Sequence, residues 1–156
     1  MPESLVTSDG RLRLEFVQTA DRVSHRLFAG DTLVLESQEG TSADAWPASP
    51  PLQSLLIEPR GEGSAVALLV GMAGKSHWSA SIEPRDGGFH CDIACRLSDA
   101  AGFLGTTYRV LDPRVTIEPV APATRVRDSN IVRITPPTDA AVGKHTVRWR
   151  YDVRIA

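Results

Sequence analysis

Two stretches that alternate apolar and polar residues lie on either side of a glycine-rich turn near the middle of the chain. They form the segment KSHWSASIEPRDGGFHCDIACRL, from Lys75 to Leu97. Successive side chains of a β-strand point to opposite faces, so this pattern predicts a β-hairpin with two different faces. Asp86-Gly87 or Gly87-Gly88 supplies the positive φ angle that a two-residue turn needs.

One face of the predicted hairpin can build a core, and the other is polar. With Asp86-Gly87 in the turn, Glu83 lies opposite His90 and His77 lies opposite Arg96. The core face then carries Trp78, Ala80, Ile82, Cys91, Ile93 and Cys95. The polar face carries His77, Ser79, Ser81, Glu83, His90, Asp92 and Arg96.

The rest of the chain also favours β-structure. Short alternating segments recur between Gly, Pro and Asp residues, and no long stretch has the apolar spacing of a helix. The segment 145–155 alternates cleanly, with one face made of Val147, Trp149, Tyr151, Val153 and Ile155. The segment 65–70 is a continuous apolar run that predicts a central strand covered on both faces. We therefore expect one all-β domain over residues 1–156, an antiparallel two-sheet β-sandwich or jelly roll of roughly ten strands. A β-barrel is the second choice.

Two stretches read as irregular loops, 37–51 and 119–130. The first is polar, holds three prolines and contains Trp46. A large aromatic side chain in a polar loop either plugs the end of the core or presents a stacking surface to a sugar or base. The sequence leaves both roles open, with the plug favoured.

Composition narrows the class of protein. Hydrophobic residues make up 42% and charged residues 23% of the 156 residues, which is typical of a globular domain. The net charge of −2 argues against a general nucleic-acid binder. No apolar run is long enough to span a bilayer, and the N-terminal residues lack the pattern of a secretory signal, so we expect a cytoplasmic protein without membrane contact.

The two cysteines are expected to be buried and unpaired. Cys91 and Cys95 lie four residues apart on one predicted strand, about 13 Å along it, which is too far for a disulfide. No second Cys/His pair has the spacing of a zinc site. We therefore predict no metal and no cofactor.

The candidate site is the polar face of the hairpin. The chain lacks the common nucleophile, phosphate-binding, dinucleotide and zinc-protease motifs, which favours a role without catalysis. Opposed His90 and Glu83 would have Cβ atoms about 5 Å apart, so they would form either an oriented general base or an ordinary cross-strand ion pair. The expected ligand-binding residues are His77, Glu83, His90, Asp92, Arg96 and Trp46.

Three functions remain open from the sequence. The first is a non-catalytic module that binds a polar ligand, for example a carbohydrate, or a protein partner. The second is a sugar-isomerising or lyase-type enzyme that uses His77 or His90 with Glu83 or Asp92. The third is a scaffold that forms homo-oligomers through its edge strands.

Overall fold

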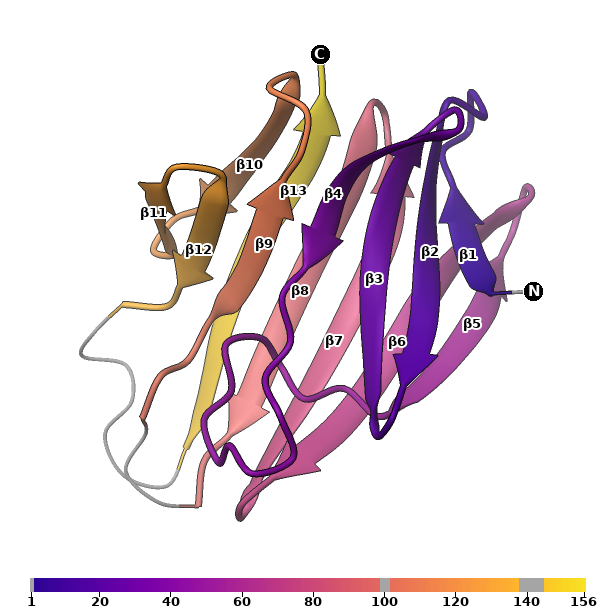
Figure 1. The fold of residues 1–156 in the computed structure, drawn as a ribbon. Coiled ribbons are helices and arrows are strands. Elements are labelled where there is room, and N and C mark those ends of the chain that lie inside the picture. Colours follow the sequence, from indigo (N-terminus) through magenta and orange to yellow (C-terminus); the bar gives the residue numbers. More distant parts are fainter. Residues whose placement is uncertain (1, 99–101, 138–144) are drawn as a thin grey trace.

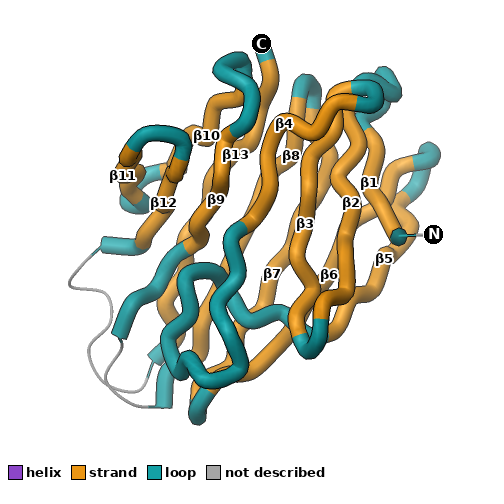
Figure 2. Tube along the Cα trace, in the orientation of Figure 1, coloured by secondary structure: helices purple, strands orange, loops and turns teal. Residues whose placement is uncertain are grey.

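Two antiparallel β-sheets pack face to face in the computed structural model, which describes residues 2–98, 102–137 and 145–156 (Figure 1). Figure 2 shows that strands dominate the described residues and that none of these residues is helical. The prediction of an all-β two-sheet sandwich is confirmed, and neither sheet closes into a barrel. The described residues include no helix that could span a lipid bilayer.

Seven strands form one sheet, in the order β1-β2-β3-β4-β9-β12-β11. They are β1 (Glu3–Val6), β2 (Leu12–Thr19), β3 (Arg22–Ala29), β4 (Thr32–Ser37), β9 (Thr106–Val110), β12 (Ile131–Thr135) and β11 (Thr124–Asp128). Six strands form the other sheet, in the order β10-β13-β8-β7-β6-β5. They are β10 (Val115–Val120), β13 (Thr146–Ile155), β8 (Gly88–Arg96), β7 (Ser76–Arg85), β6 (Ser64–Ala73) and β5 (Ser54–Arg60).

The predicted hairpin is the pair β7–β8, with the predicted register. Arg85 pairs with Gly88, so Asp86-Gly87 is the turn, and Gly87 has a φ of 75°. Glu83 lies opposite His90. The six residues of the expected core face are all buried, which places the polar face on the outside of the six-stranded sheet.

The core lies between the inner faces of the two sheets. Strand β13 runs between β8 and β10, and its inward side chains Val147, Trp149, Tyr151 and Val153 are all buried. This confirms the alternation expected at the C-terminal end of the chain. Because β13 and β10 lie on one side of the pair β8–β7 and β6 and β5 lie on the other, β8 and β7 are the central strands of this sheet.

Two expectations about individual strands are wrong. The apolar run of β6 was expected to be central and covered on both faces, but β6 is next to the edge strand β5 and Val70 on its outer face is 55% exposed. The stretch 119–130 contains strand β11, which was expected to be irregular. Every residue of β11 is exposed, so no alternation between buried and exposed positions marks it in the sequence.

Candidate functional site

Side chains on the outer face of the six-stranded sheet form rows that run across the strands. The strand registers place one residue of each neighbouring strand in each row. One row consists of Thr146, Arg96, His77 and Met72. The next consists of Arg148, Ala94, Ser79, Val70 and Ser54.

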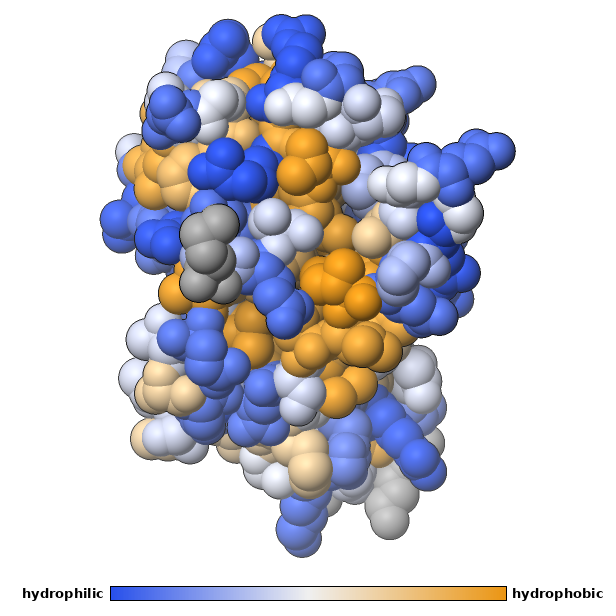
Figure 3. Space-filling view, turned by 90° about the vertical axis from the view of Figure 1, so that its right-hand side faces the viewer, coloured by the Kyte–Doolittle hydropathy of each residue, from blue (hydrophilic) through white to orange (hydrophobic). Residues whose placement is uncertain are grey.

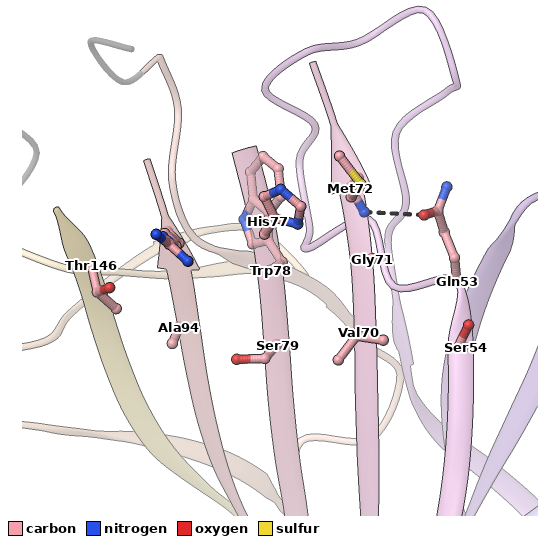
Figure 4. Close-up of a pocket in the computed structure, with 11 residues that line it drawn as sticks. Gln53, Ser54, Val70, Gly71, Met72, His77, Trp78, Ser79, Ala94 and Thr146 are labelled. Atoms are coloured by element: carbon pink, nitrogen blue, oxygen red, sulfur yellow. Dashed lines mark hydrogen bonds between the residues drawn. The ribbon is translucent and has the colours of Figure 1, made fainter. Parts of the chain in front are cut away.

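A hollow of about 520 Å³ opens over these two rows (Figure 4). Ala94 and Ser79 lie directly opposite each other in its middle, and both have short side chains. His77 and Met72 stand in the neighbouring row, and Val70 flanks Ser79. The hollow therefore results from two small residues at the centre of a sheet face, surrounded by longer ones.

The rim of the hollow offers hydrogen-bond donors. Arg96 and His77 lie opposite each other and are both exposed. Arg96 makes no ion pair with a residue that the structure describes. Gln53 accepts a hydrogen bond from the backbone N–H of Met72 at 3.0 Å through Oε1, so its Nε2 group remains available to donate (Figure 4).

No acidic residue is among the eleven described residues that line the hollow, so its fixed charge comes from Arg96. The nearest row beyond Ala94 contains Asp92, but Arg148 neutralises this carboxylate with two hydrogen bonds, one of them 2.8 Å from Nε. An anion in the hollow can therefore reach a guanidinium that forms no ion pair within the described part of the chain.

The opposite side of the hollow is apolar. Val70 is 55% exposed and Met72 is 45% exposed. Beyond them, Leu56 of β5 lies opposite Leu68 of β6 and is 59% exposed. Large apolar side chains exposed together in this way are typical of binding surfaces.

The sequence-predicted polar cluster is spread out and does not converge on one point. Of the six expected ligand-binding residues, only His77 and Arg96 line the hollow. Glu83 bonds to Arg85 on its own strand, with Nε at 3.1 Å, although His90 lies directly opposite it. His77 and Glu83 are six residues apart on β7, which separates them by about 20 Å.

His90 does pair with a carboxylate, but the partner is Asp152 of β13. Its Nδ1 lies 2.7 Å from Asp152 Oδ1, and both side chains are partly exposed. Such a pair can orient an imidazole with Nδ1 donating to the carboxylate and Nε2 free to accept a proton. Among the described residues, no hydroxyl or thiol is hydrogen-bonded to His90.

Trp46 lies away from the polar hairpin face. Its ring packs edge-on against Trp78, with centroids 6.0 Å apart and an interplanar angle of 65°. It is partly buried against the core, and a Cβ atom on Gly102 would clash with its ring at 2.6 Å. The structure thus places Trp46 as expected for a plug at the end of the core.

The core itself contains a chain of polar side chains that the sequence did not reveal. His25 Nε2 lies 2.7 Å from Tyr108 Oη, which lies 2.7 Å from Tyr151 Oη. Burial lowers the pKa of His25 to about 4 and raises those of both tyrosines well above their usual value, so all three are neutral at pH 7. Burial also raises the pKa of the free thiol Cys91 to about 12. Three of these residues, His25, Tyr108 and Cys91, line a void far smaller than the hollow, so we assign the group a structural role.

Neither a search for metal-binding side chains nor comparison with known proteins identifies a further site. The described residues contain no group of three or more His, Cys, Asp or Glu side chains that could hold a metal ion. Comparison of the chain with protein-family models, with curated proteins and with solved structures finds no match. The function must therefore be argued from the site alone.

Sequence reasoning missed most of the hollow. Ala94 and Ser79 face each other within the predicted hairpin, so their short side chains could have been noticed from the turn alone. Val70, Met72 and Gln53 come from outside the hairpin, and their positions depend on the register of β6 and β5. That register is not encoded in any local motif.

Proposed function

We propose that this protein is a non-catalytic binding module whose ligand occupies the hollow on the outer face of the six-stranded sheet. The observation that carries the proposal is the combination of Arg96, which forms no ion pair with another described residue, with exposed Val70 and Met72 around a floor of Ala94 and Ser79. A concave site with a largely apolar lining and a few polar groups is typical of small-molecule binding.

Binding is better supported than catalysis because the acid–base groups are kept apart. Glu83, His90 and Asp92 each have a separate partner, Arg85, Asp152 and Arg148. A general base and a general acid must both reach the reacting group. Among the described residues that line the hollow, His77 is the one imidazole, and none is a carboxylate that could act as its acid–base partner.

A variant that fills the hollow tests the proposal. Ser79→Tyr places a large ring over the floor, whereas Ser81→Tyr adds the same ring one row away on the same face of β7. We would record amide NMR spectra of the three proteins against a panel of neutral sugars and small organic anions. The proposal predicts that at least one compound shifts amides around Ser79 and Ala94, and that only Ser79→Tyr abolishes the shifts. Absence of any response, or shifts that survive in Ser79→Tyr, would contradict it.

Self-association through edge strands is a second candidate. Figure 3 shows apolar side chains gathered on the side of the molecule where edge strands β1 and β5 lie. Val6 of β1 is 48% exposed and Leu56 of β5 is 59% exposed. An open strand edge with apolar neighbours is suited to pairing with the same edge of a second copy. Sedimentation equilibrium of the wild type and of Leu56→Lys tests it: a dimer that the substitution dissociates supports this role, and a wild-type monomer excludes it.

A further inference from the structure

The lining of the hollow is divided between a cationic end and an apolar end. Arg96 lies on β8, and Met72 lies on β6 in the same row, with His77 between them. Neighbouring strands are about 4.8 Å apart, so the two ends of this row are about 10 Å from each other. A ligand that used both ends would therefore need a charged head and an apolar body.

We propose that the ligand is a carboxylate attached to an aliphatic chain, with the carboxylate at Arg96 and the chain over Ala94, Ser79 and Val70 toward Met72. This inference rests on the proposed function and narrows it to one class of ligand. The guanidinium of Arg96 can form two parallel hydrogen bonds with a carboxylate. The amide of Gln53 accepts a hydrogen bond from the Met72 backbone, which places it at the apolar end of the row, away from Arg96.

The charge of the lining selects for an anion. None of the eleven described lining residues is acidic, so none of them opposes a carboxylate with a fixed negative charge. Asp92, the carboxylate one row further along β8, is already held by Arg148. Arg96 would repel a cationic ligand, and the lining residues that the structure describes offer no carboxylate to bind it.

The apolar end favours an aliphatic body over a sugar ring. Carbohydrate sites commonly present an exposed aromatic face for stacking. Here the indole of Trp78 is 3% exposed, and Val70 and Met72 supply the exposed apolar surface instead. Leu56 and Leu68 continue this surface in the next row, so a chain longer than the hollow would still contact apolar side chains.

Titration calorimetry with octanoate, octan-1-ol and acetate tests the inference. Octanoate carries both features, octan-1-ol lacks the charge, and acetate lacks the chain. The variants are Arg96→Gln and, as a matched control, Arg150→Gln, because Arg150 is an exposed arginine on the same sheet face outside the hollow and without an ion pair to a described residue. Ser79→Tyr reports whether the compound occupies the hollow.

The inference predicts that octanoate binds and that each of octan-1-ol and acetate binds at least about tenfold more weakly. Arg96→Gln should weaken octanoate binding about tenfold, Arg150→Gln should leave it unchanged, and Ser79→Tyr should abolish it. Equal binding of octan-1-ol and octanoate, or equal effects of the two arginine substitutions, would overturn the inference while leaving the proposed function intact. Octanoate binding that Ser79→Tyr does not affect would overturn both.

Discussion

Ala94 of β8 lies directly opposite Ser79 of β7, and these two short side chains create the hollow on the outer face of the six-stranded sheet. The position is central, because β13 pairs with β8 on one side and β6 pairs with β7 on the other. The backbone there is held by neighbours on both sides, so the hollow is formed before a ligand arrives. Preformed sites avoid the entropic cost of ordering a loop upon binding.

Enlarging Ala94 should remove binding without harming the fold. Ala94→Leu adds a branched side chain to a half-buried position on the outer face, where it can extend toward the neighbouring Ser79 without entering the core. We expect the free energy of unfolding to change by less than about 0.5 kcal/mol, because the position lies outside the packed interior. Urea denaturation and octanoate titration of the same samples check this. A loss of several kcal/mol would show that Ala94 is part of the core packing.

His90 should be dispensable for binding. It lies four residues from Ala94 along β8, about 13 Å away, and its imidazole is held by Asp152. His90→Ala should leave octanoate affinity within about twofold of the wild type and reduce stability by about 0.2–1 kcal/mol, as for a partly exposed ion pair. Calorimetry and thermal denaturation measure the two effects. A large loss of affinity would place the ligand over the His90–Asp152 pair and revive the enzyme hypothesis.

The buried hydroxyl of Tyr108 should contribute strongly to stability. It bonds to both His25 and Tyr151, each at 2.7 Å. Tyr108→Phe leaves two buried polar groups without this partner, and we expect it to cost about 1–3 kcal/mol. Tyr151→Phe removes the end of the same chain and leaves Tyr108 bonded to His25, so its cost should be smaller. Urea denaturation curves give both values, and the reverse order would contradict this description of the core.

Glu39 should make the protein less stable as the pH rises. Burial raises its pKa from 4.5 to about 7, and its Oε1 atom is buried without a hydrogen-bond partner among the described residues. Between these values the folded state binds more protons than the unfolded state, so the free energy of unfolding falls as the pH rises through 4.5 to 7. Glu39→Gln should remove this loss, which amounts to about 3 kcal/mol at pH 8.

The neighbouring His25 acts with the opposite sign. Its pKa falls from 6.5 to about 4 in the folded state, so its contribution to stability is lost as the pH falls through that window. Both proteins retain His25, so the difference between Glu39→Gln and wild type isolates Glu39. Glu58→Gln, at an exposed site on β5, is the control and should show no pH-dependent difference. A Glu39→Gln effect of equal size at pH 4 and pH 8 would refute the assignment.

The sequence predicts this fold well where a strand has one solvent-exposed face and one buried face. The alternation around Trp78 and Trp149 assigned both residues to the core, and the Asp86-Gly87 turn fixed the pairing of Glu83 with His90. Strand β11 was not predicted, because both of its faces are exposed and its sequence therefore shows no alternation. The apolar run of β6 indicated burial on two faces, whereas the structure leaves Val70 uncovered.

The site was harder to predict than the fold. Local alternation identified the face that carries His77 and Arg96, but it also grouped them with Glu83, which lies about 20 Å away along the strand. Residue type alone suggested acid–base chemistry. The partners Arg85, Asp152 and Arg148 that occupy Glu83, His90 and Asp92 become visible only in three dimensions.

The most direct test of the account is to observe a ligand in the hollow. Isotope-filtered NMR of methyl-labelled protein with unlabelled octanoate detects ligand protons that lie close to individual methyl groups. We predict cross-peaks from the octanoate chain to the methyl groups of Val70, Met72 and Ala94, and none to buried Leu69 on the inner side of β6. Cross-peaks confined to Val6 and Leu56 at the sheet edges, or to core methyl groups, would contradict the claim that the hollow is the binding site.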